Sequence, residues 1–270
     1  MTARILEQAM AESYIPADRQ SRIQKLIQEQ GIVKVAELSK MFGVTELTIR
    51  RDLDVLEKHG ILDRTHGGAI LRHRMRIEPL YTEKDQINRG AKELIGQAVN
   101  QFVEEGDTLL INTGSTTSQV LRHLSGKKLR VITSNAGAVV EVKDPDVELI
   151  LTGGLFRRQS NSLIGGFAHC VLNHVCGSKA IIGIDGISIN YGLTTPIHQE
   201  AEVTRLMIER TQGPVIVVAD HTKMGVVSNF VTAPIDKISM LITDKKIEAN
   251  FREELEHRNI QVVIAEEALQ

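Results

Sequence analysis

Seven short apolar runs recur along the C-terminal two-thirds of the chain, and they restrict its fold more than any other feature. They lie within TLLIN, LRVIT, VELILTGG, KAIIGIDGI, PVIVVADHTK, ISMLITD and IQVVIA, and helical patterns or polar turns separate most of them. Nearly continuous apolar strands are typical of a sheet that is buried on both faces. The runs therefore predict a mostly parallel, Rossmann-like α/β domain from about residue 91 onward.

Length and composition fit such a fold and exclude other classes. The chain has 270 residues, 42% of them apolar and 24% charged, which is enough for the cores of two modest domains. No apolar run approaches the roughly 20 residues of a membrane helix, and the N-terminus lacks the apolar core of a signal peptide. Two cysteines give no disulfide framework, so we expect a cytoplasmic protein without membrane contact.

The first part of the chain has a different pattern, of three short helices and a hairpin. DRQSRIQKLIQEQG has one apolar face, and AELSKMFG is a shorter amphipathic helix that ends at Gly43. Thr45 is a favourable N-cap for the third helix, ELTIRRDLDVLEKHG. In that helix Ile49, Leu53 and Leu56 recur at spacings of four and three, so they face inward. The stretch ILDRTHGGAIL then predicts a β-hairpin, or wing.

This order of elements is that of a winged helix-turn-helix, whose third helix can enter the DNA major groove. Arginines near its N-terminal end suit contacts with phosphate or with guanine, although on an ordinary helical hairpin they would be solvated surface residues. Residues 17–76 contain twelve Lys/Arg and eight Asp/Glu, whereas the whole chain has a net charge of −2. The predicted DNA-contacting residues are Thr45, Glu46, Thr48, Arg50, Arg51, Arg64 and His66.

Residues 22–71 resemble the N-terminal signature of the DeoR family of bacterial transcription regulators. ELSKMFGVTELTIRRDLDVLEKHG and the wing RTHGGA carry the resemblance, and they fall in register over about fifty residues. It implies a winged helix-turn-helix that represses operons for sugar use and releases DNA when a sugar-derived effector binds. We therefore expect a DNA-binding domain at 18–72, a linker at 73–90 and an effector domain at 91–270.

Polar residues follow the apolar runs where the predicted strands end. In a parallel sheet these ends share one edge, at which ligands bind. The loop Gly114–Thr117 could hold a phosphate on backbone N–H groups at a helix N-terminus, and Lys223 could add a positive charge. The same residue types are also standard in turns and caps, so a structural role stays open.

The C-terminal half also resembles the family's effector domain, which is similar to sugar-phosphate isomerases such as ribose-5-phosphate isomerase. GDTLLINTGSTT, VITSN, LTGGLFRRQSNSLIG, KAIIGIDGI and ADHTKMG carry this resemblance. It implies that Gly114–Thr117 seat a phosphate and that Asp185, Glu200 and Lys223 line the sugar end. An acidic residue is common where this chain has Asn112, and this departure leaves the identity of the sugar open. The predicted effector-binding residues are Gly114, Ser115, Thr116, Thr117, Asn135, Gly153, Gly154, Asp185, Glu200 and Lys223.

Catalysis is the alternative for this half, because its carboxylates and lysine are also the residue types of an aldose–ketose isomerase. The attached DNA-binding module favours a sensor, so we expect no enzyme activity, no catalytic residues and no cofactor. The group His169, Cys170, His174 and Cys176 lacks the two separated pairs of a zinc site. We expect these cysteines to be small core residues and the chain to hold no metal.

The sequence thus predicts a DNA-binding regulator, a repressor of a carbohydrate-utilisation operon that a phosphorylated sugar relieves. Its partners would be double-stranded operator DNA, the sugar phosphate and, in a homodimer or homotetramer, copies of itself. The alternative is a sugar-phosphate isomerase-like enzyme with an attached DNA-binding module.

Overall fold

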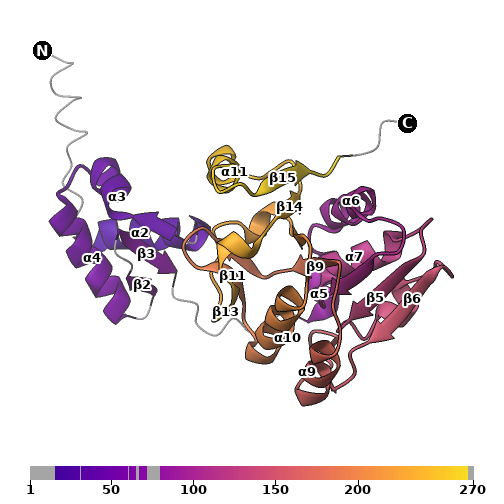
Figure 1. The fold of residues 1–270 in the computed structure, drawn as a ribbon. Helices are drawn as coiled ribbons and strands as arrows, with labels where there is room; N and C mark the ends of the chain where they lie inside the picture. The colour runs from indigo at the N-terminus through magenta and orange to yellow at the C-terminus, as the bar shows by residue number, and fades with distance from the viewer. Residues whose placement is uncertain (1–15, 31, 60, 65–66, 72–79, 267–270) are drawn as a thin grey trace, which may run out of the picture. The chain divides into compact units, whose positions relative to one another are not determined.

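The chain forms two compact units, residues 1–76 and 77–270, in a computed structural model (Figure 1). The described residues are 16–30, 32–59, 61–64, 67–71 and 80–266. Each unit has its own hydrophobic core.

The N-terminal unit is a winged helix-turn-helix, as predicted. Its three-stranded antiparallel sheet has the order β1-β3-β2. Ile23, Ile49 and Leu53 have no exposed surface, which confirms the inward faces expected for the first and third helices. The elements are α2 (Pro16–Gln30), β1 (Ile32–Lys34), α3 (Val35–Phe42), α4 (Glu46–Lys58), β2 (Leu62–Arg64) and β3 (Gly68–Leu71).

The second unit is built on a sheet of seven described strands in the order β15-β14-β12-β9-β4-β5-β6, and every neighbouring pair is parallel. The sheet grows from β4 to β6 in one direction and from β9 to β15 in the other, which is the doubly wound arrangement. The seven apolar runs are these strands, so the predicted parallel sheet is confirmed. They are β4 (Thr108–Ile111), β5 (Leu129–Thr133), β6 (Val147–Leu151), β9 (Lys179–Gly183), β12 (Val215–Val218), β14 (Met240–Thr243) and β15 (Gln261–Ile264).

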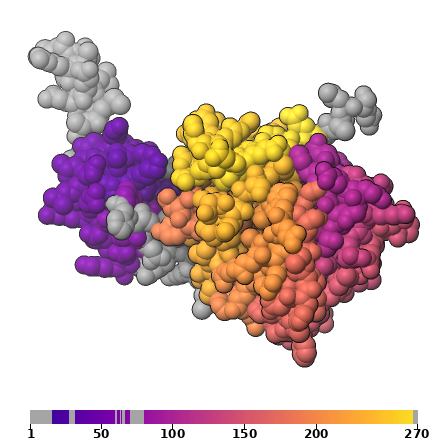
Figure 2. Space-filling model, in the orientation of Figure 1, coloured from indigo at the N-terminus to yellow at the C-terminus, as the bar shows by residue number. Residues whose placement is uncertain are grey.

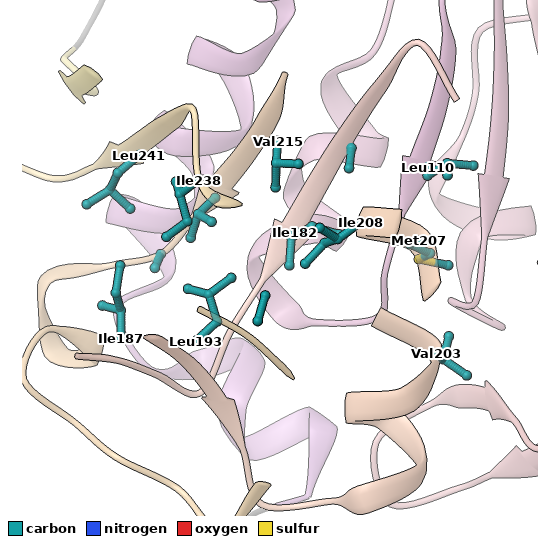
Figure 3. Close-up of a cluster of buried hydrophobic side chains, with 14 of the residues drawn as sticks. Leu110, Ile182, Ile187, Leu193, Val203, Met207, Ile208, Val215, Ile238 and Leu241 are labelled. Atoms are coloured by element: carbon teal, nitrogen blue, oxygen red, sulfur yellow. The ribbon is translucent and has the colours of Figure 1, made fainter. Parts of the chain in front are cut away.

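Helices cover both faces of this sheet. Successive strand residues point to opposite faces, and Leu109 and Leu110 are both fully buried. Leu109 packs in one core with α6 (Arg89–Val99) and α7 (Ser115–His123), and Leu110 packs in another with α9 (Gly166–Asn173) and α10 (His198–Glu209). Figure 3 shows the second core, in which side chains of α10 lie against the central strands. Burial on both faces explains why the runs are continuously apolar.

Smaller elements surround the large sheet, and the sequence pattern did not predict most of them. At the surface, the magenta α6 adjoins the yellow C-terminal segments, although they are far apart in the chain (Figure 2). Two small antiparallel sheets are β7 (Leu155–Arg157) with β8 (Ser162–Ile164), and β10 (Gly186–Ser188), β11 (Gly192–Thr195) and β13 (Phe230–Ala233). Short helices are α5 (Tyr81–Gln86), η1 (Asn100–Phe102), α8 (Ala138–Glu141), η2 (His221–Lys223), η3 (Ile235–Lys237) and α11 (Ala249–Glu256).

Candidate DNA interface and effector site

Helix α4 begins with the predicted N-cap and exposes its N-terminal end. The Thr48 backbone N–H donates to Thr45 Oγ1 at 3.2 Å. Thr45, Glu46 and Arg51 are exposed, and Thr48 and Arg50 are half-buried. Arg50 Nη2 lies 3.5 Å from Glu46 Oε2, whereas the Arg51 guanidinium has no partner within the described part of the chain. This end of α4 can thus present a free cation to DNA, and the base and phosphate contacts themselves stay predictions.

Arg64 braces the wing against α4. Its Nη1 donates to the Arg50 carbonyl oxygen at 2.7 Å and to Asp54 Oδ1 at 2.5 Å, and its backbone N–H donates to Glu57 Oε1 at 3.0 Å. The structure thereby assigns Arg64 a bracing role that the sequence pattern did not indicate, and its DNA contact stays a prediction. His66, the other predicted wing contact, lies outside the described residues.

A buried ion pair joins α2 to α4. Arg19 Nε donates to Asp52 Oδ2 at 2.5 Å, and Gln20 Nε2 donates to Asp52 Oδ1 at 3.0 Å. Arg19 is 5% exposed and Asp52 is 3% exposed. A charged residue at an inward helical position gives no apolar signal, so sequence reasoning missed this pair. It sets the position of α4 relative to α2.

The order in which the chain adds strands to the large sheet reverses between β4 and β9. Asn112 joins these two strands at their carboxyl ends. Asn112 Nδ2 donates to the Gly183 carbonyl oxygen at 2.9 Å, and Asn112 Oδ1 accepts from the Gly183 N–H at 2.8 Å. Nδ2 also lies 3.1 Å from Thr204 Oγ1. The residue at which the sequence departs from the family pattern therefore holds the strand ends together. Doubly wound sheets bind ligands in the crevice at this point.

Helix α7 begins at the same crevice, with the loop predicted to seat a phosphate. Gly114 is its N-cap and has no side chain, so the first N–H groups of the helix lack a capping partner. Thr117 Oγ1 donates to the backbone oxygens of Asn112 and Gly114, at 2.9 and 3.0 Å, and so shapes the turn. Ser115 and Thr116 are nearly buried, and their hydroxyls have no partner among the described residues. Two hydroxyls beside an uncapped helix N-terminus are a suitable arrangement for holding an anion, and anion binding here stays a prediction.

Asp185 follows β9 on the other side of the crevice and accepts two polar contacts. Lys84 Nζ donates to Asp185 Oδ1 at 2.7 Å, and Thr195 Oγ1 donates to Oδ2 at 3.0 Å. Burial alone would raise the pKa of Asp185, but the charge and hydrogen bond of Lys84, with a weaker attraction from Lys223, hold it below the usual value. Lys223 has no hydrogen-bond or ion-pair partner in the described chain, so its cation is available to a ligand.

Lys92 and Asp220 are a further lysine and carboxylate that influence each other's pKa. Lys92 on α6 is 3% exposed, and burial lowers its pKa although Asp220 partly offsets the effect. Asp220 follows β12 and accepts from Asn88 Nδ2 at 3.0 Å. Burial would raise the Asp220 pKa, but hydrogen bonds from Thr222 and the nearby lysines lower it. The carboxyl edge therefore holds carboxylates and ammonium groups close together.

Glu200 and Asn135 belong to a second hydrogen-bond network on this edge. Ser162 Oγ donates to Glu200 Oε1 at 3.0 Å, and Arg157 Nη1 lies 3.6 Å from the same oxygen. Asn135 forms a backbone bridge with Ser162, and its Nδ2 donates to Ser118 Oγ at 2.8 Å. The network thus connects the start of α10 to the first turn of α7. Glu200 is an ion-paired carboxylate in this arrangement.

Gly153 and Gly154 follow β6 in left-handed backbone conformations, with φ of 66° and 108°. A Cβ on Gly154 would lie 2.4 Å from the Ile164 carbonyl oxygen, so only glycine allows the β6 end to pack against β8. The structure therefore gives Gly154 a packing role. Ligand contacts by either glycine stay predictions.

Residues 80–90, which the sequence assigns to the linker, carry side chains that reach the carboxyl edge of the large sheet. Tyr81 and Lys84 lie on α5, and Asn88 directly precedes α6. Sequence reasoning missed all three because the stretch has no sustained apolar periodicity.

The cysteine-containing stretch does not behave as predicted. Both Cys170 and Cys176 are exposed, so the prediction that they are core residues is wrong. Ala168 and Leu172 form the buried face of α9, and Cys170 lies between them on the solvent side. His174 Nδ1 contacts the Cys170 carbonyl oxygen at 2.7 Å. Within the described residues, no three His, Cys, Asp or Glu side chains are arranged to hold a metal.

No helix in the described ranges combines the length and apolar character that a bilayer crossing requires.

Comparison with known proteins identifies the family. The DeoR-like helix-turn-helix domain matches residues 19–75, and the DeoR C terminal sensor domain matches residues 87–245. The chain belongs to the DeoR family. This DeoR-family member is a DNA-binding transcription regulator with an N-terminal helix-turn-helix and a C-terminal sensor domain, as the sequence predicted.

Similar proteins cover nearly the whole of this DeoR-family chain. The HTH-type transcriptional regulator GlpR of Haloferax volcanii is 32% identical over 250 residues, which are 92% of this chain and 98% of that protein. The HTH-type transcriptional regulator GolR of Listeria innocua is 32% identical over 256 residues, 93% of this chain and 99% of that protein. Among solved structures, ribose 5-phosphate isomerase A of Methanocaldococcus jannaschii aligns with a TM-score of 0.38 and 14% identity, over 51% of this chain and 55% of that one.

Proposed function

We propose that this regulator represses an operon for carbohydrate use and that a phosphorylated sugar bound at the carboxyl edge relieves the repression. One observation carries the proposal. Anion-binding groups and carboxylates meet at the direction change of a doubly wound sheet, where Lys223 and the start of α7 have no partner among the described residues. A phosphorylated sugar is a ligand with a dianion at one end and hydroxyl donors at the other, and it complements this arrangement.

The predicted site residues take distinct roles in this proposal. The backbone N–H groups of Gly114–Thr117 and the Lys223 ammonium bind the phosphate. Asp185 and Glu200 accept hydrogen bonds from sugar hydroxyls, because both are carboxylates with further acceptor capacity. Asn135, Gly153 and Gly154 shape the remainder of the same edge. Asn112 acts indirectly, through the positions of β4 and β9.

DNA binding by the N-terminal unit follows the same logic. In the proposal, Thr45, Glu46, Thr48, Arg50 and Arg51 on α4 read or position the operator, and the wing contributes His66 and Arg64. In a homodimer or homotetramer the other copies of the chain supply further DNA-binding units, because operators for helix-turn-helix dimers contain repeated half-sites. The effector shifts the operator affinity only by its differential affinity for the DNA-binding and DNA-releasing arrangements.

The isomerase alternative fits the geometry less well. A general base works best when its pKa is near the operating pH, and the pKa of Asp185 is held below its usual value. Glu200 is paired with Arg157, so its carboxylate is already engaged by a cation. We propose a site that binds its ligand without turning it over.

The proposal is tested by ligand screening followed by a DNA-release assay on the full chain. A panel of pentose and hexose phosphates, with the unphosphorylated sugars and inorganic phosphate as controls, is screened by thermal shift, because a ligand of the folded state raises its apparent stability. Hits are then added to operator complexes recovered by selection from random DNA duplexes. We expect one sugar phosphate to stabilise the protein and release DNA.

A matched control variant sharpens this test. Lys143→Ala removes a lysine that is exposed before β6 and serves as the matched control for Lys223→Ala. Stabilisation by inorganic phosphate alone, turnover of the sugar phosphate without DNA release, or the absence of any stabilising sugar phosphate would contradict the proposal.

A further inference from the structure

Helix α5 spans the crevice at the direction change of the large sheet. Tyr81 OH donates to Ser118 Oγ at 2.6 Å, and Ser118 lies in the first turn of α7. Lys84 Nζ donates to Asp185 Oδ1 at 2.7 Å, at the end of β9. Tyr81 and Lys84 are three residues apart and so share one face of α5. One face of this helix therefore contacts both sides of the proposed effector site.

Polar contacts, and not apolar packing, hold α5 in place. The helix has six residues, and none of them is buried. Lys92 Nζ donates to the Lys84 carbonyl oxygen at 2.5 Å, so the same residue is held at both its backbone and its side chain. Isolated helices of this length are unstable in water. The position of α5 therefore depends on groups that belong to, or adjoin, the proposed effector site.

A phosphorylated sugar offers new partners to both members of the Lys84–Asp185 ion pair. Its hydroxyl groups donate to a carboxylate, and its dianion attracts an ammonium group. Each side chain is about a quarter exposed, at 22% for Lys84 and 23% for Asp185, so a ligand in the crevice can reach them. The exchange leaves no buried charge without a partner.

We propose that Lys84 is a residue of the effector site and that α5 is its effector-responsive latch. Without effector, the Lys84–Asp185 ion pair holds α5 over the crevice. Bound effector forms its own contacts with Asp185 and Lys84, breaks the ion pair between them and so destabilises α5. The inference rests on the proposed function for the identity of the effector, but the latch itself is a property of the ligand-free chain.

Chain order gives this latch a route to DNA binding. Tyr81 begins the first described helix after the wing strand β3, which ends at Leu71. A change at α5 therefore acts on the end of the segment that leads to the DNA-binding unit. A coupling of this kind needs one element whose two states are biased by ligand, and the proposed latch gives α5 that role.

Hydrogen–deuterium exchange of the full chain tests the latch at peptides that cover α5. Lys84→Met removes the ammonium and keeps the length of the side chain, Lys84→Arg retains the charge, and Gln86→Ala is a matched exposed change on the same helix. Without any ligand, we expect Lys84→Met to speed α5 exchange about tenfold and to weaken operator binding several-fold. Gln86→Ala should remain near wild type, and Lys84→Arg, which keeps the cation, should retain part of the protection that Lys84→Met loses.

The wild-type chain is tested with the pentose and hexose phosphates and inorganic phosphate. We expect a sugar phosphate that releases operator to speed α5 exchange as well. Release of the operator with unchanged α5 exchange would refute the latch and leave the proposed function intact. If no sugar phosphate binds, the proposed function fails. The ligand-free measurements on Lys84→Met then still test whether the Lys84–Asp185 ion pair holds α5 in place. Wild-type α5 exchange and operator affinity in that variant would overturn the inference.

Discussion

Replacing Asp52 by alanine should abolish DNA binding although Asp52 cannot reach DNA. Its carboxylate is 3% exposed and accepts from Arg19 Nε at 2.5 Å, from Arg19 Nη2 at 3.3 Å and from Gln20 Nε2 at 3.0 Å. Asp52→Ala removes the carboxylate that pairs with the buried Arg19 guanidinium, and breaking a buried ion pair costs about 3–5 kcal/mol. A domain of this size is stable by only about 3–8 kcal/mol. The DNA-binding unit of the variant should therefore be marginally folded or unfolded.

The assay compares the DNA-binding unit with the sensor unit in one full-length protein. Hydrogen exchange of peptides from α2 and α4 should accelerate by at least about a hundredfold, the equivalent of ~3 kcal/mol, while peptides from the large sheet stay protected. Operator binding should fall in parallel. The matched control is Glu37→Gln, which removes an exposed i,i+3 ion pair with Lys34 and should cost less than about 1 kcal/mol.

A double variant decides whether the buried charge is the cause. Arg19→Met combined with Asp52→Leu replaces the ion pair by apolar side chains, and such replacements are often neutral or stabilising. We expect this double variant to recover protection in α4. Protection and operator affinity that stay within ~1 kcal/mol of wild type in Asp52→Ala would refute the reasoning.

Three further predictions concern the two sites. Arg51→Ala should weaken operator binding by about tenfold or more, measured by gel shift, without changing sugar-phosphate affinity, and an unchanged operator affinity would remove Arg51 from the interface. Lys223→Ala should lower sugar-phosphate affinity by about tenfold or more in calorimetry while ligand-free operator binding is kept; loss of operator binding with retained effector affinity would reverse this assignment. The pKa of Asp185 in the folded state is below its unfolded value of about 4. The ionised carboxylate therefore stabilises the fold above pH ~4, and this stabilisation is lost as the pH falls through the folded-state pKa. Thermal melts should therefore show a shallower acid-side decline for Asp185→Asn than for wild type, and parallel melting curves would contradict the assignment.

The architecture was predictable because it is encoded in local patterns. Strands buried on both faces must be continuously apolar, and Leu109 and Leu110 show why, since they point into different cores. In the same way Ile49 and Leu53 follow the helical period because one face of α4 is buried. The small sheets escaped prediction because their short strands lack the continuous apolar runs that mark the strands of the large sheet.

The candidate site was predictable only in part. Positions after strands could be assigned to one edge of the sheet, since parallel strands end together. Which side chains meet there could not be assigned, because a contact such as Lys84 with Asp185 joins residues 101 positions apart and leaves no local pattern. Arg64 was assigned to DNA contact by residue type, and Asn112 was noted only as a departure from the family pattern. The structure shows both in hydrogen bonds that hold elements together.

The amino-acid sequence by itself determined two units, a winged helix-turn-helix and a parallel sheet with a polar carboxyl edge, because periodicity and capping act over neighbouring residues. The tertiary structure alone decided that α5 contacts that edge, that Asp52 is ion-paired with Arg19 inside the DNA-binding unit and that Lys223 is left without a partner in the described chain. Charged side chains find their partners through the folded backbone, and the energy of each pair depends on burial and distance, which exist only once the chain has folded.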